Sequence, residues 1–138
     1  MFKLSCLLAL AATIAAPATA ADLDLRFTGI EARKGAIMAV IFASEADYIA
    51  GKPTRAMMIP AKGATAKQIV AGLGPGRYAI KAFHDIDGDG QMGANPFGQP
   101  TETFAFSNNA AANMGPASWS AAAFDIGAGT TVQTITIK

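Results

Sequence analysis

Apolar and polar residues alternate near both ends of the chain, and this period of two predicts β-strands. Leu23, Leu25 and Phe27 alternate with polar neighbours over residues 22–28, as in a strand with one buried and one solvated face. Residues 130–137 are rich in Thr, Val and Ile and predict a second strand of this kind. Because both strands look half-exposed, we expect them at or near sheet edges.

The middle of the chain predicts more short strands, separated by Gly and Pro. The run 36–42 is apolar throughout, which indicates a strand covered on both faces. Residues 77–84 alternate, with Tyr78, Ile80 and Ala82 on one face. Further short strands are expected over 54–59, 65–70 and 103–107, and helical turns over 43–51 and 110–112.

About seven short strands and no long helix predict a single all-β domain over residues 21–138. The expected fold is an antiparallel β-sandwich with a long irregular loop region, and a small closed barrel is the alternative. Gly and Pro interrupt any long element between residues 85 and 124. A stretch of this length within a compact domain is usually functional or held by local contacts.

Residues 1–20 have the pattern of a secretory signal peptide. Lys3 precedes an apolar run over residues 4–16, and the small residues Ala18 and Ala20 suit a signal-peptidase site. The run is shorter than the roughly 20 apolar residues of a membrane span. We therefore predict cleavage after Ala20, a periplasmic or secreted location, and no transmembrane segment in the mature chain.

Charge and cysteine content exclude several classes of function. The 11 basic and 10 acidic residues give a net charge of +1, so the chain lacks the basic excess of a nucleic-acid-binding protein. The one cysteine, Cys6, lies in the predicted signal peptide. The mature chain therefore has no disulfide, thiolate nucleophile or cysteine-type zinc site.

The loop HDIDGDGQM, residues 84–92, contains the pattern D-x-D-x-D-G. Alternate carboxylates can converge on one hard cation, and oxygen ligands favour Ca²⁺. Twelve-residue EF-hand spacing from Asp85 ends on Pro96 instead of Glu, so a calcium loop without flanking helices is expected. The alternative is a solvated acidic turn whose Asp side chains accept local N–H groups. The expected metal ligands are Asp85, Asp87, Asp89, Gln91 (through its carbonyl), Asn95 and Glu102.

The same acidic residues support a second hypothesis, a hydrolase that acts on envelope glycans. Glycosidases use two opposed carboxyls, and Glu102 with one of the loop aspartates would supply them. The only histidine, His84, is a candidate base or a polar residue at a strand end. Neighbours in a strand point to opposite faces, so His84 and Asp85 should not pair.

Side chains downstream of the acidic loop support a third hypothesis, a carbohydrate-binding module. Phe97 and Trp119 could stack on sugar rings if exposed, or cover the core if buried. The amides of Asn108 and Asn109 could contact a ligand, although Asn is also common in turns.

Several segments resemble the bacterial domain-of-unknown-function family 2141. They are LGPGRYA at 73–79, FHD at 83–85, FGQPTE at 97–102, FAFSNN at 104–109 and GP at 115–116. The resemblance implies an exported Ig-like sandwich of Gram-negative envelopes, with a PG-x-Y turn similar to that of prealbumin-like and Cna-B-like domains. This chain has Gly93 where the family often has Asp, which removes one potential ligand. A shared fold supplies no activity.

Residues and resemblance together predict an exported, non-catalytic binding or structural module of the cell envelope. We expect no catalytic residues, Ca²⁺ as the one cofactor, and an envelope protein or a glycan as partner.

Overall fold

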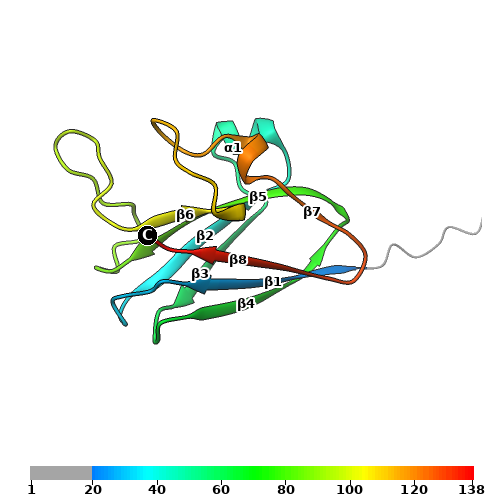
Figure 1. Cartoon of the computed structure of the whole chain (residues 1–138), viewed down its shortest axis with the longest axis horizontal. Helices are drawn as coiled ribbons and strands as arrows, with labels where there is room; N and C mark the ends of the chain where they lie inside the picture. The colour runs from blue at the N-terminus through cyan, green and yellow to red at the C-terminus, as the bar shows by residue number, and fades with distance from the viewer. Residues whose placement is uncertain (1–19) are drawn as a thin grey trace, which may run out of the picture.

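The computed structural model describes residues 20–138, which fold into two facing β-sheets (Figure 1). The predicted signal peptide lies almost wholly outside these residues, so its cleavage stays a prediction. The strands are β1 (Ala21–Thr28), β2 (Ala36–Phe42), β3 (Arg55–Pro60), β4 (Ala66–Leu73), β5 (Gly76–Asp85), β6 (Phe104–Phe106), β7 (Phe124–Ile126) and β8 (Thr130–Thr136). The helices are α1 (Glu45–Ala50), α2 (Trp119–Ala122) and the 3-10 turn η1 (Ser107–Asn109).

The smaller sheet has the strand order β4-β1-β8. The two alternating segments are strands, as predicted: β8 lies at an edge of the sheet, and β1 lies beside it as the central strand. Alternation indicates that one face of a strand is solvated. In a sheet that packs against the core on one face only, the central strand also has a solvated face. The pairing of β1 with β8 is parallel, which corrects the expectation of a wholly antiparallel sandwich. The chain crosses from β7 in the other sheet and enters β8 beside Asp22, running in the direction of β1.

The larger sheet has the order β3-β2-β5-β6, with β7 paired to the start of β5. The apolar strand β2 lies between β3 and β5, its inward residues are buried, and Met38 and Val40 on its outward face are half-buried. All of these strand pairs are antiparallel. The described residues form an all-β sandwich and no closed barrel, which rules out the alternative fold.

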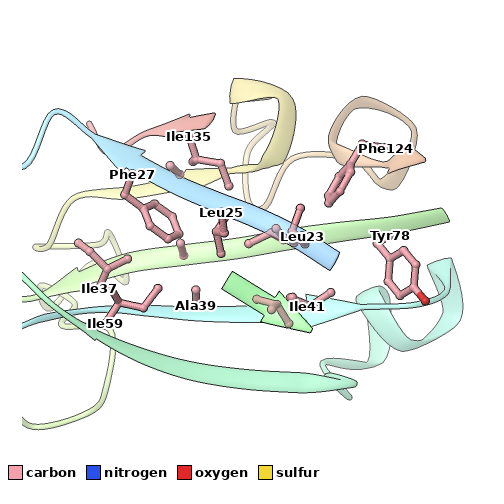
Figure 2. Packing of buried hydrophobic residues seen from close by; sticks show 14 of the residues in the cluster. Leu23, Leu25, Phe27, Ile37, Ala39, Ile41, Ile59, Tyr78, Phe124 and Ile135 are labelled. Carbon is pink, nitrogen blue, oxygen red and sulfur yellow. The ribbon is translucent and has the colours of Figure 1, made fainter. Parts of the chain in front are cut away.

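The main core fills the space between the two sheets (Figure 2). Leu23, Leu25 and Phe27 of β1 face Ile37 and the neighbouring inward residues of β2, and all four side chains are fully buried. Burial of a large aliphatic or aromatic side chain stabilises a fold by about 1.5–3 kcal/mol. The alternation that predicted β1 therefore marks the residues that hold the sheets together.

The short helices fall partly where they were expected. Ser44 caps α1 by accepting the N–H of Asp47 at 3.1 Å, and Gly51 ends it in the left-handed conformation. The helical turn expected over 110–112 is wrong, because the turn forms earlier, as η1. Both α2 and β7 lie in a segment without periodicity and were not predicted.

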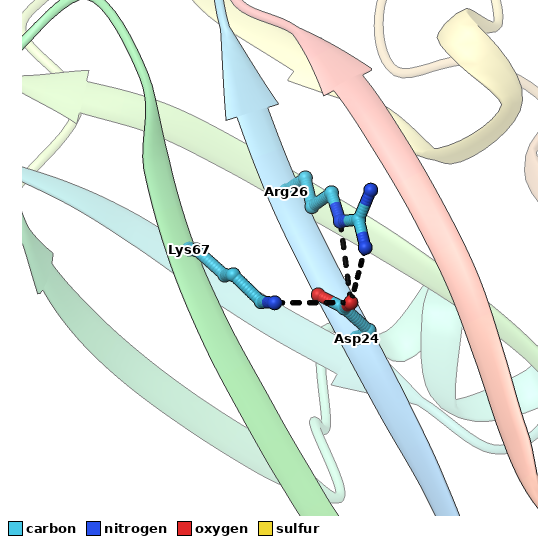
Figure 3. Close-up of polar contacts among 3 residues, drawn as sticks. All are labelled: Asp24, Arg26 and Lys67. Carbon is cyan, nitrogen blue, oxygen red and sulfur yellow. Dashed lines mark hydrogen bonds and ion pairs between the residues drawn. The ribbon is translucent and has the colours of Figure 1, made fainter.

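The outer face of the smaller sheet carries an ion-pair cluster (Figure 3). Asp24 Oδ2 accepts Nη2 of Arg26 at 2.6 Å and lies 3.2 Å from Nζ of Lys67 on β4. The Arg26 hydrogen bond, with help from Lys67, lowers the pKa of Asp24 despite its burial.

No helix within residues 20–138 has the length and apolar character that a membrane crossing requires.

Candidate functional site

The acidic loop begins where β5 ends, at the buried residue Asp85. Its Oδ1 accepts the N–H of Gly88 at 2.9 Å, and its Oδ2 accepts that of Gly90 at 3.0 Å. Both glycines have positive φ, which bends the backbone around the carboxylate. The backbone of the loop therefore curls around the Asp85 carboxylate, which holds it by two hydrogen bonds.

The other two aspartates make the local turns expected of an acidic loop. Asp87 Oδ1 accepts the N–H of Asp89, and Asp89 Oδ1 accepts that of Gln91. Oxygens of all three carboxylates lie within 4.8 Å of one another. The hydrogen bond from Asp89 favours charged Asp87, but partial loss of water and the neighbouring carboxylates outweigh it and raise the pKa of Asp87. Repulsion among these charges is thus not fully relieved within the loop.

Two further predicted ligands, Glu102 and Asn95, accept backbone N–H groups. Glu102 accepts two backbone N–H groups, from Ile86 at 3.0 Å and Gly93 at 3.0 Å, and so closes the base of the loop. Asn95 Oδ1 accepts the N–H groups of Phe97 and Gln99. The carboxylates of Asp85, Asp87 and Asp89 therefore gather at one place, while Glu102 and Asn95 are engaged by backbone N–H groups.

His84 lies on the opposite face of β5 from Asp85, as strand alternation predicted. Its ring is buried, and Nε2 lies 2.8 Å from the carbonyl oxygen of Lys34. A carbonyl only accepts, so Nε2 carries a proton in this contact. The histidine therefore ties β5 to the turn before β2.

Asn108 and Asn109 join β6 to its neighbours. Both have positive φ, which Asn tolerates better than most residues. The Asn108 amide donates to the carbonyl of Ala123 at 2.8 Å, and the Asn109 carbonyl accepts the N–H of Thr136 at 2.8 Å. These amides fix α2 and β8 against the larger sheet.

The two candidate sugar-binding aromatics occupy different environments. Trp119 packs edge-on against Tyr48, with ring centres 5.7 Å apart, in a small cluster over the outer face of the larger sheet. Phe97 is 89% exposed, in the loop between β5 and β6. That loop stands well apart from α2 (Figure 1). The two rings therefore do not form one flat platform.

A groove on the outer face of the larger sheet was not foreseen. We call it the outer groove, and its volume is about 790 Å³. Its floor is two rows of side chains in register across β3, β2, β5 and β6, and its walls are the loops over 90–100 and 112–116. The first row is Met58, Met38, Phe83 and Phe104, and the second is Ala56, Val40, Lys81 and Phe106.

The lining of the outer groove is apolar and rich in methionine. All the methionines within residues 20–138 contribute to it: Met38, Met57, Met58, Met92 and Met114. Methionine is flexible and polarizable, and it is common on surfaces that adapt to varied apolar ligands. The sequence held one signal of this groove, the apolar residues on both faces of 36–42, but the walls come from distant loops.

Lys81 is the one charged side chain among the groove residues. Its Nζ donates to the carbonyl oxygen of Tyr48 at 2.9 Å and lies 4.0 Å from the centre of the Tyr48 ring. Loss of water lowers the pKa of Lys81. The groove thus combines a large apolar surface with a single partly desolvated cation.

Two facing sheets define a β-sandwich domain, and this one has an apolar groove on one outer face. The chain belongs to a bacterial family of uncharacterized proteins, DUF2141, whose family model matches residues 25–134. This match confirms the family that the sequence segments suggested. Neither the comparison with curated proteins nor the comparison with solved structures found a match.

Proposed function

We propose that this domain is an exported, non-catalytic binding module of the cell envelope, with its ligand in the outer groove. The groove itself carries the proposal, because about 790 Å³ lies within the range of ligand pockets. Its methionine lining suits an apolar ligand. Export rests on the pattern of residues 1–20.

The positions of the acidic residues favour binding over hydrolysis. A glycosidase needs two carboxyls that flank one bond, whereas both oxygens of Asp85 and of Glu102 accept backbone N–H groups. The lining of the outer groove contains none of the aspartates and not Glu102. An apolar ligand in this groove would therefore meet no acid–base pair.

A calcium ion in the acidic loop is a second, structural proposal. Three carboxylates lie within 4.8 Å of one another, and loss of water together with their mutual repulsion raises the pKa of Asp87. A divalent cation would relieve this repulsion. The loop also supplies Gly90 and Met92 to the outer groove, so an ordered loop would fix one groove wall.

Binding of the neutral dye Nile red to purified residues 21–138 tests the proposed binding function. We expect a blue-shifted, saturable emission that Met58→Glu weakens, because Met58 lines the groove and is 69% exposed. Ile69→Glu is the matched control, since Ile69 is an exposed apolar residue of β4 in the other sheet. Absent dye binding, or equal losses in both variants, would overturn the proposal.

A further inference from the structure

We propose that the ligand of the outer groove is a single-chain amphiphile with a carboxylate head, held by Lys81. This inference rests on the proposed binding function and specifies its ligand class. Three observations support this ligand class: the apolar groove, the absence of a charged partner for Lys81 within residues 20–138, and the positions of Lys81 and Asp85 along β5.

The apolar part of the groove suits one flexible hydrocarbon chain. Met58, Met38 and Phe83 lie side by side on three adjacent strands and form a continuous apolar floor. Met92 and Met114 reach the groove from its two loop walls. Unbranched thioether side chains adjust to irregular apolar shapes, so floor and walls can adapt to a bound chain.

Lys81 lacks a charged partner. Within residues 20–138, the ion pairs are those that Asp24 makes on the other sheet. Lys81 makes one hydrogen bond, to Tyr48, and its ammonium lies near the rings of Tyr48 and Phe42. An ammonium has three donors, and a carboxylate would supply both the missing charge and an acceptor.

The order of charges along β5 sets the direction of the ligand. Lys81, Phe83 and Asp85 occupy alternate positions and therefore share the outer face. Asp85 is the first residue of the acidic cluster. A carboxylate would be repelled at that end and attracted at Lys81, so the hydrocarbon chain should run from Lys81 over Phe83 toward the acidic loop.

Three ligands with one chain length test the inference: dodecanoate, dodecanol and protonated dodecylamine. Titration calorimetry on residues 21–138, below micelle concentrations and in calcium-free buffer, should give the order dodecanoate, dodecanol, dodecylamine. A net hydrogen bond to a charged group predicts roughly tenfold tighter binding of dodecanoate than of dodecanol. High salt should reduce this preference.

Lys81→Met should remove the preference for dodecanoate and retain dodecanol binding, because the apolar stem is kept. Lys52→Met, which changes an exposed lysine after α1, should leave the preference intact. Equal binding of dodecanoate and dodecanol by the unaltered protein overturns this inference, whether or not Lys81→Met folds, and leaves the binding function standing. Failure of all three ligands and of Nile red overturns the binding function itself.

Discussion

Lys81 Nζ and the carbonyl oxygen of Tyr48 lie 2.9 Å apart, and the same ammonium lies 4.0 Å from the centre of the Tyr48 ring. This double contact joins the middle of β5 to α1. The hydroxyl of Tyr48 in turn donates to the carbonyl of Ala117, which holds the segment before α2. Tyr48 therefore links the charged residue of the outer groove to the segment before α2.

Lys81 should titrate below the ordinary lysine pKa of 10.5, because burial disfavours its charged form. The unfolded chain then binds more protons, so stability should rise as the pH increases through the folded-state pKa toward 10.5. NMR titration of the lysine side chains measures the pKa. Saturation with dodecanoate should raise it, and an unchanged value would argue against contact with the head group.

Calcium should stabilise the domain through the acidic loop. At a tenfold excess over the dissociation constant, we expect the melting temperature to rise by about 5 °C. Asp87→Ala and Asp89→Ala should abolish the rise, chelator should reverse it, and Mg²⁺ should give less. Glu31→Ala, an exposed carboxyl outside the loop, is the control. If millimolar Ca²⁺ does not change the melting temperature of the wild type, the calcium hypothesis is wrong. The loop is then an acidic turn held by its own hydrogen bonds to the backbone.

Asp24 should make the domain sensitive to acid. Its folded-state pKa is lowered, chiefly by the Arg26 hydrogen bond, so its contribution is complete above the unfolded value of about 3.8 and is lost as the pH falls below it. Arg26→Met should lower the free energy of unfolding at pH 7. The free energy of unfolding of this variant should then fall less steeply between pH 4 and 2 than that of the wild type. Urea unfolding across this range measures both effects. Arg33→Met, an exposed arginine elsewhere, should keep the wild-type slope.

Asn108→Ala should destabilise the fold by about 2–3 kcal/mol. The change removes amide hydrogen bonds to Ala121 and Ala123 and places alanine at a φ of 58°. Asn108→Gly separates the two causes, because glycine accepts this φ without restoring the amide. Denaturant unfolding of both variants should show a smaller loss for glycine. Equal losses would assign the whole effect to the hydrogen bonds.

The exported protein should begin at Ala21. Cleavage after Ala20 follows from the small residues Ala18 and Ala20. Intact-mass measurement on protein from the periplasm or the medium checks this expectation. A species that keeps Cys6 would contradict it.

The sequence alone determined most of the strands and the faces that they bury, although it did not predict β7. Alternation at Leu23, Leu25 and Phe27 reflects a buried and a solvated face, and this pattern is local. The opposite orientations of His84 and Asp85 also followed from it. Alternation contains no information about partners, so the central place of β1 and its parallel pairing with β8 needed the tertiary structure.

The acidic loop was visible in the sequence because its three aspartates lie within five residues of one another. Only the tertiary structure showed that Glu102 closes the loop and that Asn95 bonds to its own neighbours. The outer groove was the feature least accessible from the sequence. Met38, Met58 and Met92 are far apart in the chain, and they meet only because strand pairing aligns two of them and the loop brings the third across the sheet.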